Sequence, residues 1–291
     1  MARDATASNF RRKRRIYSAS TLYVVAPSRW LAGRLADSML APAARECRVI
    51  PNGVDLATFT SGDRNAARER LGFPRDALIL LFAANGILNN PWKDFRTLRG
   101  AVALAARSLP DRRVLLLAVG EDAAAERAGT AEIAFLPYQF DHDLVAACYH
   151  AADLYVHAAR AETFPNTVLE ALACGTPVVA SAVGGVLEQV RGLPLPGADP
   201  KHPTHGPEHG TGALVPPGDA EAMAAAIVSL ANDPELRRRL EENAARDARG
   251  RFDRDVQVET YLEWFREILA QTAHTAPPAG PAQAPGGGHG G

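Results

Sequence analysis

The sequence predicts an α/β fold in which a doubly wound parallel sheet carries helices on both faces. From residue 75 onward, short apolar runs that suit buried strands alternate with segments whose apolar residues recur every three or four positions. Strands that alternate with helices along a chain form parallel sheets through right-handed crossovers. Such sheets bind ligands at the carboxyl ends of their strands, so the functional residues should lie there.

The composition excludes several other classes of protein. Hydrophobic residues make up 47% of the 291 residues and the formal net charge is −1, so nothing favours nucleic-acid binding by bulk electrostatics. Cys47, Cys148 and Cys174 are far apart and form no pair typical of a disulfide scaffold or a zinc site. No apolar run approaches the roughly 20 residues of a membrane span, and the basic N-terminus lacks a signal peptide's apolar segment. We therefore expect a soluble, cytoplasmic protein without a metal or cofactor.

The first 52 residues predict only a small structural piece. Residues 1–20 are polar with a basic run at 11–15, which indicates either a solvated tail or link, or a contact with a membrane surface or a phosphate. Residues 21–26 and 47–50 predict two short strands, and Ser28 predicts the N-cap of a helix between them. Pro51-Asn52-Gly53 then predicts a turn. One strand–helix–strand piece is too little to bury a core of its own.

The strands of the main sheet are predicted by apolar runs at residues 77–84, 114–119, 133–136, 154–157, 177–180 and 213–215. The helices are predicted by apolar stripes, whose members are Phe95, Leu98, Val102 and Ala105 in one helix, Met223, Ile227 and Leu230 in the next, Leu236 and Leu240 in a third, and Val258, Tyr261, Leu262, Phe265 and Leu269 in the last. Asp219 and Asp233 are the expected caps of the second and third of these helices. Beyond Gln271 the sequence is rich in Pro, Ala and Gly, and we expect disorder.

The segment from residue 161 to residue 181 carries the strongest functional signal. Pro165 suits the first turn of a helix, and Gly175 suits a left-handed cap at its end. The free amides of Asn166, Thr167 and Val168 should then point into the crevice, where a helix start favours an anion. Glu162 precedes this helix, and Glu170 lies about one turn into it. Taken alone, the two glutamates also suit a surface loop and a well-placed carboxylate near a helix start.

The whole segment resembles the E-x7-E segment of the family 4 retaining glycosyltransferases, which have the two-domain GT-B fold. The resemblance implies that Glu170 binds the ribose diol of a nucleotide and that Glu162 contacts hydroxyls of the donor sugar. It also implies contacts from the backbone of Asn166 and Thr167 to sugar and phosphate, and Phe164 is a further candidate between them.

The resemblance extends over about residues 20–270. Residues 49–55, Val-Ile-Pro-Asn-Gly-Val-Asp, are similar to the family's interdomain segment, and Gly184-Gly185 with Glu188 match its Gly-Gly turn, where a ligand comes close. The resemblance implies a remnant of the acceptor domain at 1–52, an interdomain linker at 53–75 and a Rossmann-like nucleotide-sugar-binding domain at 76–251. A C-terminal helix at 252–270 and a disordered tail at 271–291 complete the expected organisation.

Lys93 matches a lysine with which the family neutralises the donor's diphosphate. At a helix start a lysine opposes the helix dipole, so a bound anion would explain its presence; the alternative is a solvated surface lysine. The family's arginine is missing, and Asn85-Gly86 stands near its place. Asp94 replaces the family's glycine after the lysine.

Three other patterns have simpler explanations than metal or ligand binding. Asp141-His142-Asp143 and Asp253-Arg254-Asp255 each read D-x-D, but their first aspartates suit helix caps. The histidines near Glu208 fall in a Pro/Gly-rich insertion that indicates a solvated loop; they are His202, His205 and His209. His157 ends a strand at the crevice and either touches a sugar or is satisfied beside the core.

The expected function is retaining glycosyl transfer from a nucleoside diphosphate sugar to an unknown acceptor, in cell-surface glycan or polysaccharide synthesis. Glu162 and Lys93 are the expected catalytic residues, with Glu170, Phe164, Asn166, Thr167, Asn85, Gly86, Gly184 and Gly185 binding substrate. The alternative is a non-catalytic nucleotide-sugar-binding remnant or partner subunit; an epimerase or phosphorylase of this fold is disfavoured by the E-x7-E segment. An acceptor-domain partner or the inner face of the membrane are the expected contacts, and Trp264 or its neighbours should form an exposed apolar patch.

Overall fold

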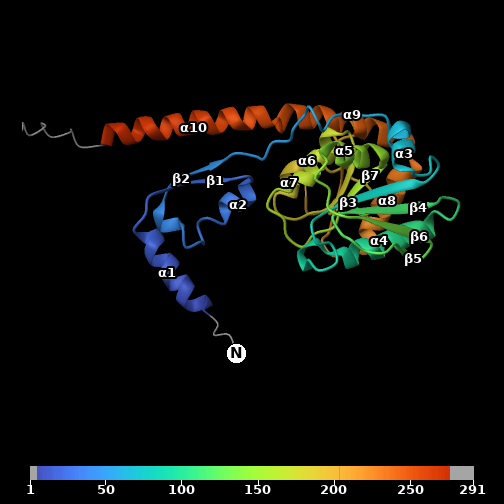
Figure 1. Ribbon diagram of the computed structural model, residues 1–291, viewed down its shortest axis with the longest axis horizontal. Coiled ribbons are helices and arrows are strands. Elements are labelled where there is room, and N and C mark those ends of the chain that lie inside the picture. The colour runs from blue at the N-terminus through green and yellow to red at the C-terminus, as the bar shows by residue number, and fades with distance from the viewer. Residues whose placement is uncertain (1–4, 203, 276–291) are drawn as a thin grey trace, which may run out of the picture.

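The computed structural model describes residues 5–202 and 204–275, and Figure 1 shows two units of unequal size. We call residues 5–50 the N-terminal unit and residues 54–251 the large unit. A long last helix, α10 (Arg254–Thr275), runs from the large unit back over the N-terminal unit. Because α10 continues to Thr275, the expectation of disorder from residue 271 is wrong for residues 271–275; residues 276–291 of that prediction lie outside the described residues.

The large unit contains the predicted parallel sheet. Its parallel strands are β3 (Leu78–Ala83), β4 (Val114–Val119), β6 (Ala131–Leu136), β7 (Leu154–His157), β8 (Val178–Ser181) and β9 (Gly212–Val215), which confirms each predicted strand. A three-residue edge strand that we did not predict, β5 (Glu126–Ala128), pairs antiparallel with β6. It is too short and too charged to show an apolar pattern. The strand order is β5-β6-β4-β3-β7-β8-β9.

Helices cover both faces of this sheet, as the alternating pattern predicts. One face carries α4 (Phe95–Ser108) and α8 (Ala220–Asn232); the other carries α5 (His142–Ala151), α6 (Asn166–Ala173) and α9 (Pro234–Arg251). Successive residues of one strand point to opposite faces, so Ile79 joins the core under α5 and α6 whereas Leu80 joins the core under α4 and α8. Both side chains are fully buried, and each such burial contributes about 1.5–3 kcal/mol. A four-residue helix, α7 (Val186–Gln189), follows β8 and was not predicted.

Residues 53–75, which read as linker, contain a helix that rests on the large unit. α3 (Arg64–Leu71) begins at the capping side chain of Asp63 and packs against α5. Arg68 is buried, and its Nη2 donates to Asp153 Oδ2 over 2.7 Å. The helix has few apolar residues, so its sequence shows no stripe; it is held by a charge pair between residues 85 positions apart.

The N-terminal unit is a two-stranded parallel sheet with short helices. β1 (Leu22–Ala26) and β2 (Ala44–Val49) pair, and α2 (Arg29–Gly33) follows Ser28, whose Oγ accepts from the Leu31 amide; these three predictions are confirmed. A short turn of helix, η1 (Ala41–Ala43), precedes β2. The expected polar tail is instead helical, as α1 (Thr6–Ser18), although none of its residues is buried. Residues 51–53 form no turn and lead straight into the large unit.

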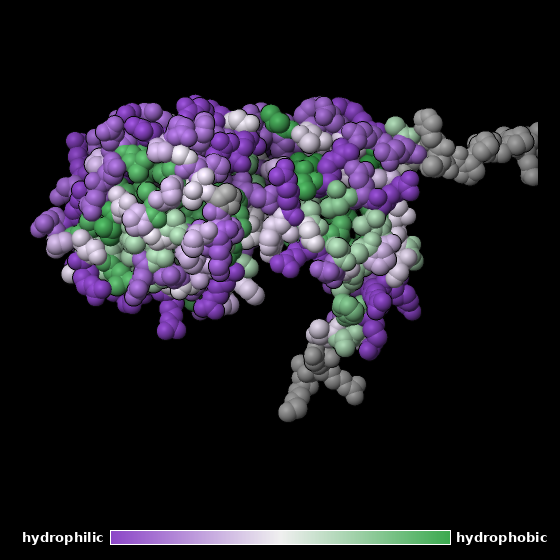
Figure 2. Space-filling model, turned by 180° about the vertical axis from the view of Figure 1, so that it is seen from behind, coloured by the Kyte–Doolittle hydropathy of each residue, from purple (hydrophilic) through white to green (hydrophobic). Residues whose placement is uncertain are grey.

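α10 closes the N-terminal unit with one buried aromatic. Trp264 is 2% exposed; its Nε1 donates to Glu46 Oε1 over 3.0 Å and its ring meets Tyr23 edge to face. The expectation was that Trp264 or its neighbours are exposed; Trp264 is buried, and the neighbours Val258, Leu262, Phe265 and Leu269 are each 41–68% exposed. Figure 2 also shows apolar residues at the surface of the N-terminal unit, below α10. None of the described helices is both long and apolar enough to span a bilayer.

Candidate active site

The predicted site residues converge at the carboxyl edge of the sheet, where β3 and β7 lie side by side. The chain leaves β3 towards β4 on one side and returns from β6 to β7 on the other, so this is the topological switch point where doubly wound sheets bind ligands. Asn85 and Lys93 come from the loop after β3, and Glu162 comes from the loop after β7. Thr167 and Glu170 lie in the helix that follows. A cavity of about 150 Å³ between these elements is lined by Asn85, Thr167 and Glu170, among others.

The start of α6 has the predicted form. Pro165 is its N-cap residue, and Gly175 closes its end with a φ of 75°. The amide of Val168 donates to Pro165 O over 3.3 Å, so the expectation that it is free is wrong. Asn166 and Thr167 occupy the first two helical positions, whose amides have no acceptor within a helix. These two amides and the helix dipole make the edge favourable for an anion.

Glu170 lies in a half-buried position with one strong partner. Tyr149 Oη donates to its Oε2 over 2.8 Å. Burial raises the pKa of Glu170, and the hydrogen bond from Tyr149 and the charge of His142 only partly oppose that effect. An ionised carboxylate in such a place gains from hydrogen-bond donors such as a pair of hydroxyl groups.

Glu162 forms an ion pair with Lys93, whose Nζ donates to Oε1. Both side chains are mostly buried, so Lys93 is engaged with a carboxylate rather than solvated. Burial tends to raise the pKa of Glu162, but the hydrogen bonds and charges of His157 and Lys93 together hold it below its usual range. Glu162 is therefore ionised at neutral pH.

His157 is fully buried and only half satisfied. Its Nδ1 lies 3.1 Å from Tyr155 Oη, and that hydroxyl lies 2.8 Å from Thr167 Oγ1. Its Nε2 has no well-formed hydrogen bond among the described residues and lies 3.4 Å from Glu162 Oε1. The sequence left open whether His157 touches a sugar or is satisfied beside the core. Its Nδ1 is satisfied beside the core by Tyr155, whereas its Nε2 faces Glu162. The sequence does not predict that Tyr149 hydrogen-bonds Glu170 or that Tyr155 hydrogen-bonds His157, because buried aromatics at such positions suit a core equally well.

The predicted glycines Gly184, Gly185 and Gly86 have different structural roles. A Cβ on Gly184 would lie 1.8 Å from Glu162 O, and one on Gly185 would lie 1.9 Å from Thr163 O. These two glycines therefore admit the backbone of residues 162–163. Gly86 has a φ of 68°, and a Cβ there would meet no atom within 4 Å, so the space beside it is open. The Phe164 side chain is 4% exposed and packs against Phe252, which places it in the core.

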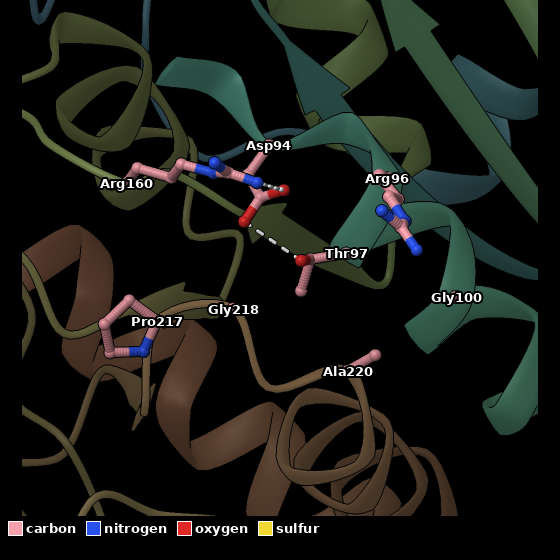
Figure 3. A pocket seen from close by; sticks show the side chains of 8 residues that line it. All are labelled: Asp94, Arg96, Thr97, Gly100, Arg160, Pro217, Gly218 and Ala220. Carbon is pink, nitrogen blue, oxygen red and sulfur yellow. Dashed lines mark hydrogen bonds and ion pairs between the residues drawn. The ribbon is translucent and has the colours of Figure 1, made fainter. Parts of the chain in front are cut away.

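Asp94 stands where the family has a glycine, and its backbone adopts a conformation that glycine favours. Its φ of 42° and ψ of 46° are left-handed, and no other non-glycine residue in the described ranges has a positive φ. Aspartate tolerates this conformation better than most residues. Its carboxylate accepts from Thr97 Oγ1 over 2.9 Å and lies 3.5 Å from Arg160 Nη2, as Figure 3 shows.

The pocket in Figure 3 is larger than the crevice cavity, at about 610 Å³. It lies between the first turns of α4 and α8, and Arg160, which we did not predict, reaches into it. None of the predicted substrate-binding residues lines it. We place the candidate site at this edge of the sheet because the Lys93–Glu162 ion pair and the start of α6 lie there, and Glu170 and Thr167 line the smaller cavity beside them.

The D-x-D patterns act as caps, as expected. Asp141 Oδ1 accepts from the amides of Asp143 and Leu144, and Asp253 Oδ1 accepts from the amide of Asp255. In the part of the chain that the structure describes, no group of three or more His, Cys, Asp or Glu side chains is placed to hold a metal ion.

Comparison with known proteins places this arrangement in a family. The model of the family described as "Glycosyl transferases group 1" matches residues 63–247. The D-inositol 3-phosphate glycosyltransferase of Saccharomonospora viridis is 35% identical over 258 residues, covering 84% of this chain and 54% of that protein. The protein of the same name from Kineococcus radiotolerans is 37% identical over 244 residues, covering 77% and 52%. The chain thus spans about half the length of these curated relatives.

Solved structures agree on the fold. Sucrose-phosphate synthase from Thermosynechococcus elongatus superposes with a TM-score of 0.69 at 26% identity, over 93% of this chain and 65% of that one. Anabaena HepE, in complex with UDP and glucose, gives a TM-score of 0.67 at 22% identity, over 90% and 67%.

Proposed function

The chain belongs to the group 1 glycosyl transferases, and from that premise we propose that it binds a nucleoside diphosphate sugar in the crevice between β3 and β7 and serves glycosyl transfer with retention. The observation that carries the proposal is the convergence of Lys93, Glu162 and the start of α6 with Glu170 one turn further in. A cation and a helix start suit a diphosphate, and flanking carboxylates suit the hydroxyl groups on either side of it.

Each residue has a definite role in this proposal. Glu170 accepts from the ribose diol, because its carboxylate lines the cavity under Asn85 and retains lone pairs beyond its bond from Tyr149. Glu162 accepts from hydroxyls of the sugar. Lys93 and the amides of Asn166 and Thr167 stabilise the negative charge that develops on the departing diphosphate, an electrostatic contribution to transfer.

The Lys93–Glu162 ion pair supports a specific order of contacts. In the free protein the ammonium group is paired with Glu162. A diphosphate that draws Lys93 away leaves Glu162 ionised beside His157, ready to accept hydroxyl hydrogens from the sugar. The ion pair therefore keeps both charges compensated until the nucleotide sugar replaces it.

A second candidate function is binding without transfer, and one observation favours it. No arginine occurs between Ala84 and Pro91, where the resemblance leads one to expect a second cation for the diphosphate. Lys93 alone then neutralises the leaving group, which suits binding better than rapid transfer. Measurement of turnover separates the two candidates, since a binding subunit releases no free nucleoside diphosphate beyond the rate of spontaneous hydrolysis.

A cytoplasmic location at the inner face of the membrane belongs to the proposal as well. The helix α1 carries five consecutive basic residues, and Phe10 and Ile16 on it are about half exposed. Basic helices with exposed apolar residues bind anionic lipid surfaces. Sedimentation with vesicles containing phosphatidylserine, compared with vesicles of phosphatidylcholine alone, tests this part.

The experiment for the proposed function is a thermal-shift screen with UDP-glucose, UDP-N-acetylglucosamine and GDP-mannose, beside UDP and GDP. A ligand that binds only the folded chain raises Tm. We expect at least one nucleotide sugar to raise the Tm of the wild-type chain, and Glu170→Ala to abolish or greatly reduce that shift. No shift with any of these ligands, or an equal shift in Glu170→Ala, would contradict the proposal.

A further inference from the structure

The loop at residues 162–165 is held by four hydrogen bonds to its backbone from groups outside both the loop and α6. It lies between β7 and α6 and forms neither helix nor strand, so its shape depends on these contacts. Each of its four carbonyl oxygens accepts from a different group, and the donors in order are the Gly185 amide, Ser28 Oγ, Asn52 Nδ2 and Gln189 Nε2, at 2.9–3.2 Å. This loop carries Glu162, and its conformation decides where that carboxylate lies.

Two of the four donors come from outside the large unit. Ser28 begins the helix α2 of the N-terminal unit, and Asn52 lies in the connection between the units. Ser28 is fully buried and uses its hydroxyl twice, accepting from the Leu31 amide and donating to Thr163 O over 2.9 Å. Asn52 Nδ2 donates to Phe164 O over 3.2 Å and to Asn166 Oδ1 over 3.0 Å.

A third contact fixes α2 so that Ser28 points at the loop. The carboxylate of Glu188 accepts from the amides of Arg29 and Trp30, over 3.0 Å and 2.9 Å. Glu188 belongs to α7, directly after the glycines whose missing side chains admit the backbone of residues 162–163. The N-terminal unit and the segment at 184–189 therefore hold the loop from two sides.

We propose that Ser28 and Asn52 are positioning residues for Glu162, through which the N-terminal unit sets the affinity for the sugar part of the nucleotide sugar. The inference rests on the proposed function and deepens it. A displacement of the N-terminal unit changes the backbone at residues 163 and 164 and moves Glu162. The contact of the nucleotide with Glu170 lies further along α6 and is retained. Ser28, unlike Asn52, makes no hydrogen bond to the start of α6, so the two ligands can be separated with Ser28→Ala.

The first experiment uses Ser28→Ala with Ser38→Ala as its matched control. Ser38 lies in the same unit, and its Oγ also donates to a carbonyl and accepts from an amide, those of Leu35 and Leu40, but it makes no bond to the loop. In the ligand-free protein we expect faster amide hydrogen exchange in the peptide spanning residues 158–166 in Ser28→Ala. Ser38→Ala should exchange there as the wild type does. Unchanged exchange in Ser28→Ala overturns the proposal.

The second experiment measures binding by calorimetry with UDP-glucose and UDP, or with GDP-mannose and GDP where the screen selects that base. Ser28→Ala should lower the affinity for the nucleotide sugar about fivefold, as expected from the loss of one hydrogen bond, and leave the affinity for the bare nucleoside diphosphate unchanged. Asn52→Asp replaces the donor to Phe164 O by an acceptor oxygen, so it should lower the affinity for the nucleotide sugar further. In a Glu162→Ala background, Ser28→Ala should have no additional effect, because the two residues act as one.

The outcomes separate this inference from the proposed function. A wild-type chain that binds the nucleotide sugar no better than the nucleoside diphosphate removes the assigned role of Glu162, and this inference falls with it. If the wild type binds the nucleotide sugar more tightly than the nucleoside diphosphate and Ser28→Ala keeps this full preference, only the present inference is overturned. Equal losses for both ligands in Ser28→Ala also overturn it, because they mean a general structural role.

Discussion

The large unit and the N-terminal unit are held together by different forces. In the large unit, every residue of β3, β4, β7, β8 and β9 is buried between two layers of helices. In the N-terminal unit, four of the five residues of β1 are only partly buried and no residue of α1 is buried. Its place depends on Trp264 of α10 and on polar side chains such as Ser28 and Glu188. The comparison teaches that apolar burial supports the proposed nucleotide site, whereas a few individual hydrogen bonds connect the N-terminal unit to it.

The largest effect should come from a buried charge in the large unit. Asp153 is 5% exposed, accepts from Arg68 and from the Ile79 amide, and lies within 4 Å of Arg64 and Arg237. Asp153→Ala leaves the buried guanidinium of Arg68 without its anion, which costs about 3–5 kcal/mol. Thermal unfolding should show a fall in Tm of roughly 10 °C.

A matched change at the contact between α10 and the N-terminal unit should do almost nothing to Tm. Glu267 of α10 pairs with Arg48 of β2 over 2.7 Å, and the two side chains are 51% and 31% exposed. Surface pairs contribute little, so Glu267→Ala should melt with the wild type. Equal losses in Asp153→Ala and Glu267→Ala would contradict the contrast between the units.

Trp264→Ala should open the N-terminal unit alone. Truncation of a buried tryptophan typically costs about 3–5 kcal/mol, and here the contacts that are lost all lie on β1, β2 and α10. We expect faster hydrogen exchange at residues 22–26 and 44–49, with no change at 78–83 and 114–119. Faster exchange across both sheets would mean that the units unfold as one.

Glu170→Gln should stabilise the free protein slightly while it weakens nucleotide binding. Burial raises the pKa of Glu170, so its folded form favours the proton, and the ionised carboxylate destabilises the fold at pH values above that pKa. Removal of the charge should raise Tm by roughly 1–3 °C at pH 7. The difference should shrink as the pH falls through the raised pKa of Glu170 and vanish below the pKa of a glutamate in the unfolded chain, about 4.3.

The smallest perturbation compares thiols in the two units. Cys47 on β2 is exposed, whereas Cys148 and Cys174 are buried in the large unit. Burial raises the pKa of Cys148 to about 11 and that of Cys174 further, so neither forms the reactive thiolate at neutral pH. Ellman's reagent at pH 8 should find one fast thiol in the folded wild type, none in Cys47→Ser, and three in denatured wild type. Fast reaction of Cys148 or Cys174 would indicate that the large unit opens readily.

Local sequence patterns were sufficient for the main sheet and for the start of α6. Each parallel strand contains a short apolar run, and Pro165 and Gly175 mark the ends of α6 by their own backbone preferences. Lys93 and Glu162 were assigned to the crevice through the family resemblance, and the ion pair between them was not predicted.

What the sequence did not predict depends on partners far along the chain. α3 lacks an apolar stripe and is held by Arg68 on Asp153, and Ser28 meets Thr163 across 135 positions. The Gly184-Gly185 pair predicts a close approach, but a glycine does not reveal whether a ligand or another backbone comes close. The basic run in α1 gave no helical signal because the helix buries none of its side chains.

The measurement that tests the central claim most directly is calorimetry of Glu162→Ala and Glu170→Ala with a nucleotide sugar and with its nucleoside diphosphate. We predict that Glu170→Ala weakens the binding free energy of both ligands by about 1–3 kcal/mol, the scale of lost charge-assisted hydrogen bonds. Glu162→Ala should weaken binding of the nucleotide sugar and should bind the bare nucleoside diphosphate at least as tightly as the wild type does, because Glu162 no longer competes with the diphosphate for Lys93. Equal losses for both ligands in Glu162→Ala, or unchanged nucleotide affinity in Glu170→Ala, would contradict the assignment of the crevice between β3 and β7 as a nucleotide-sugar site.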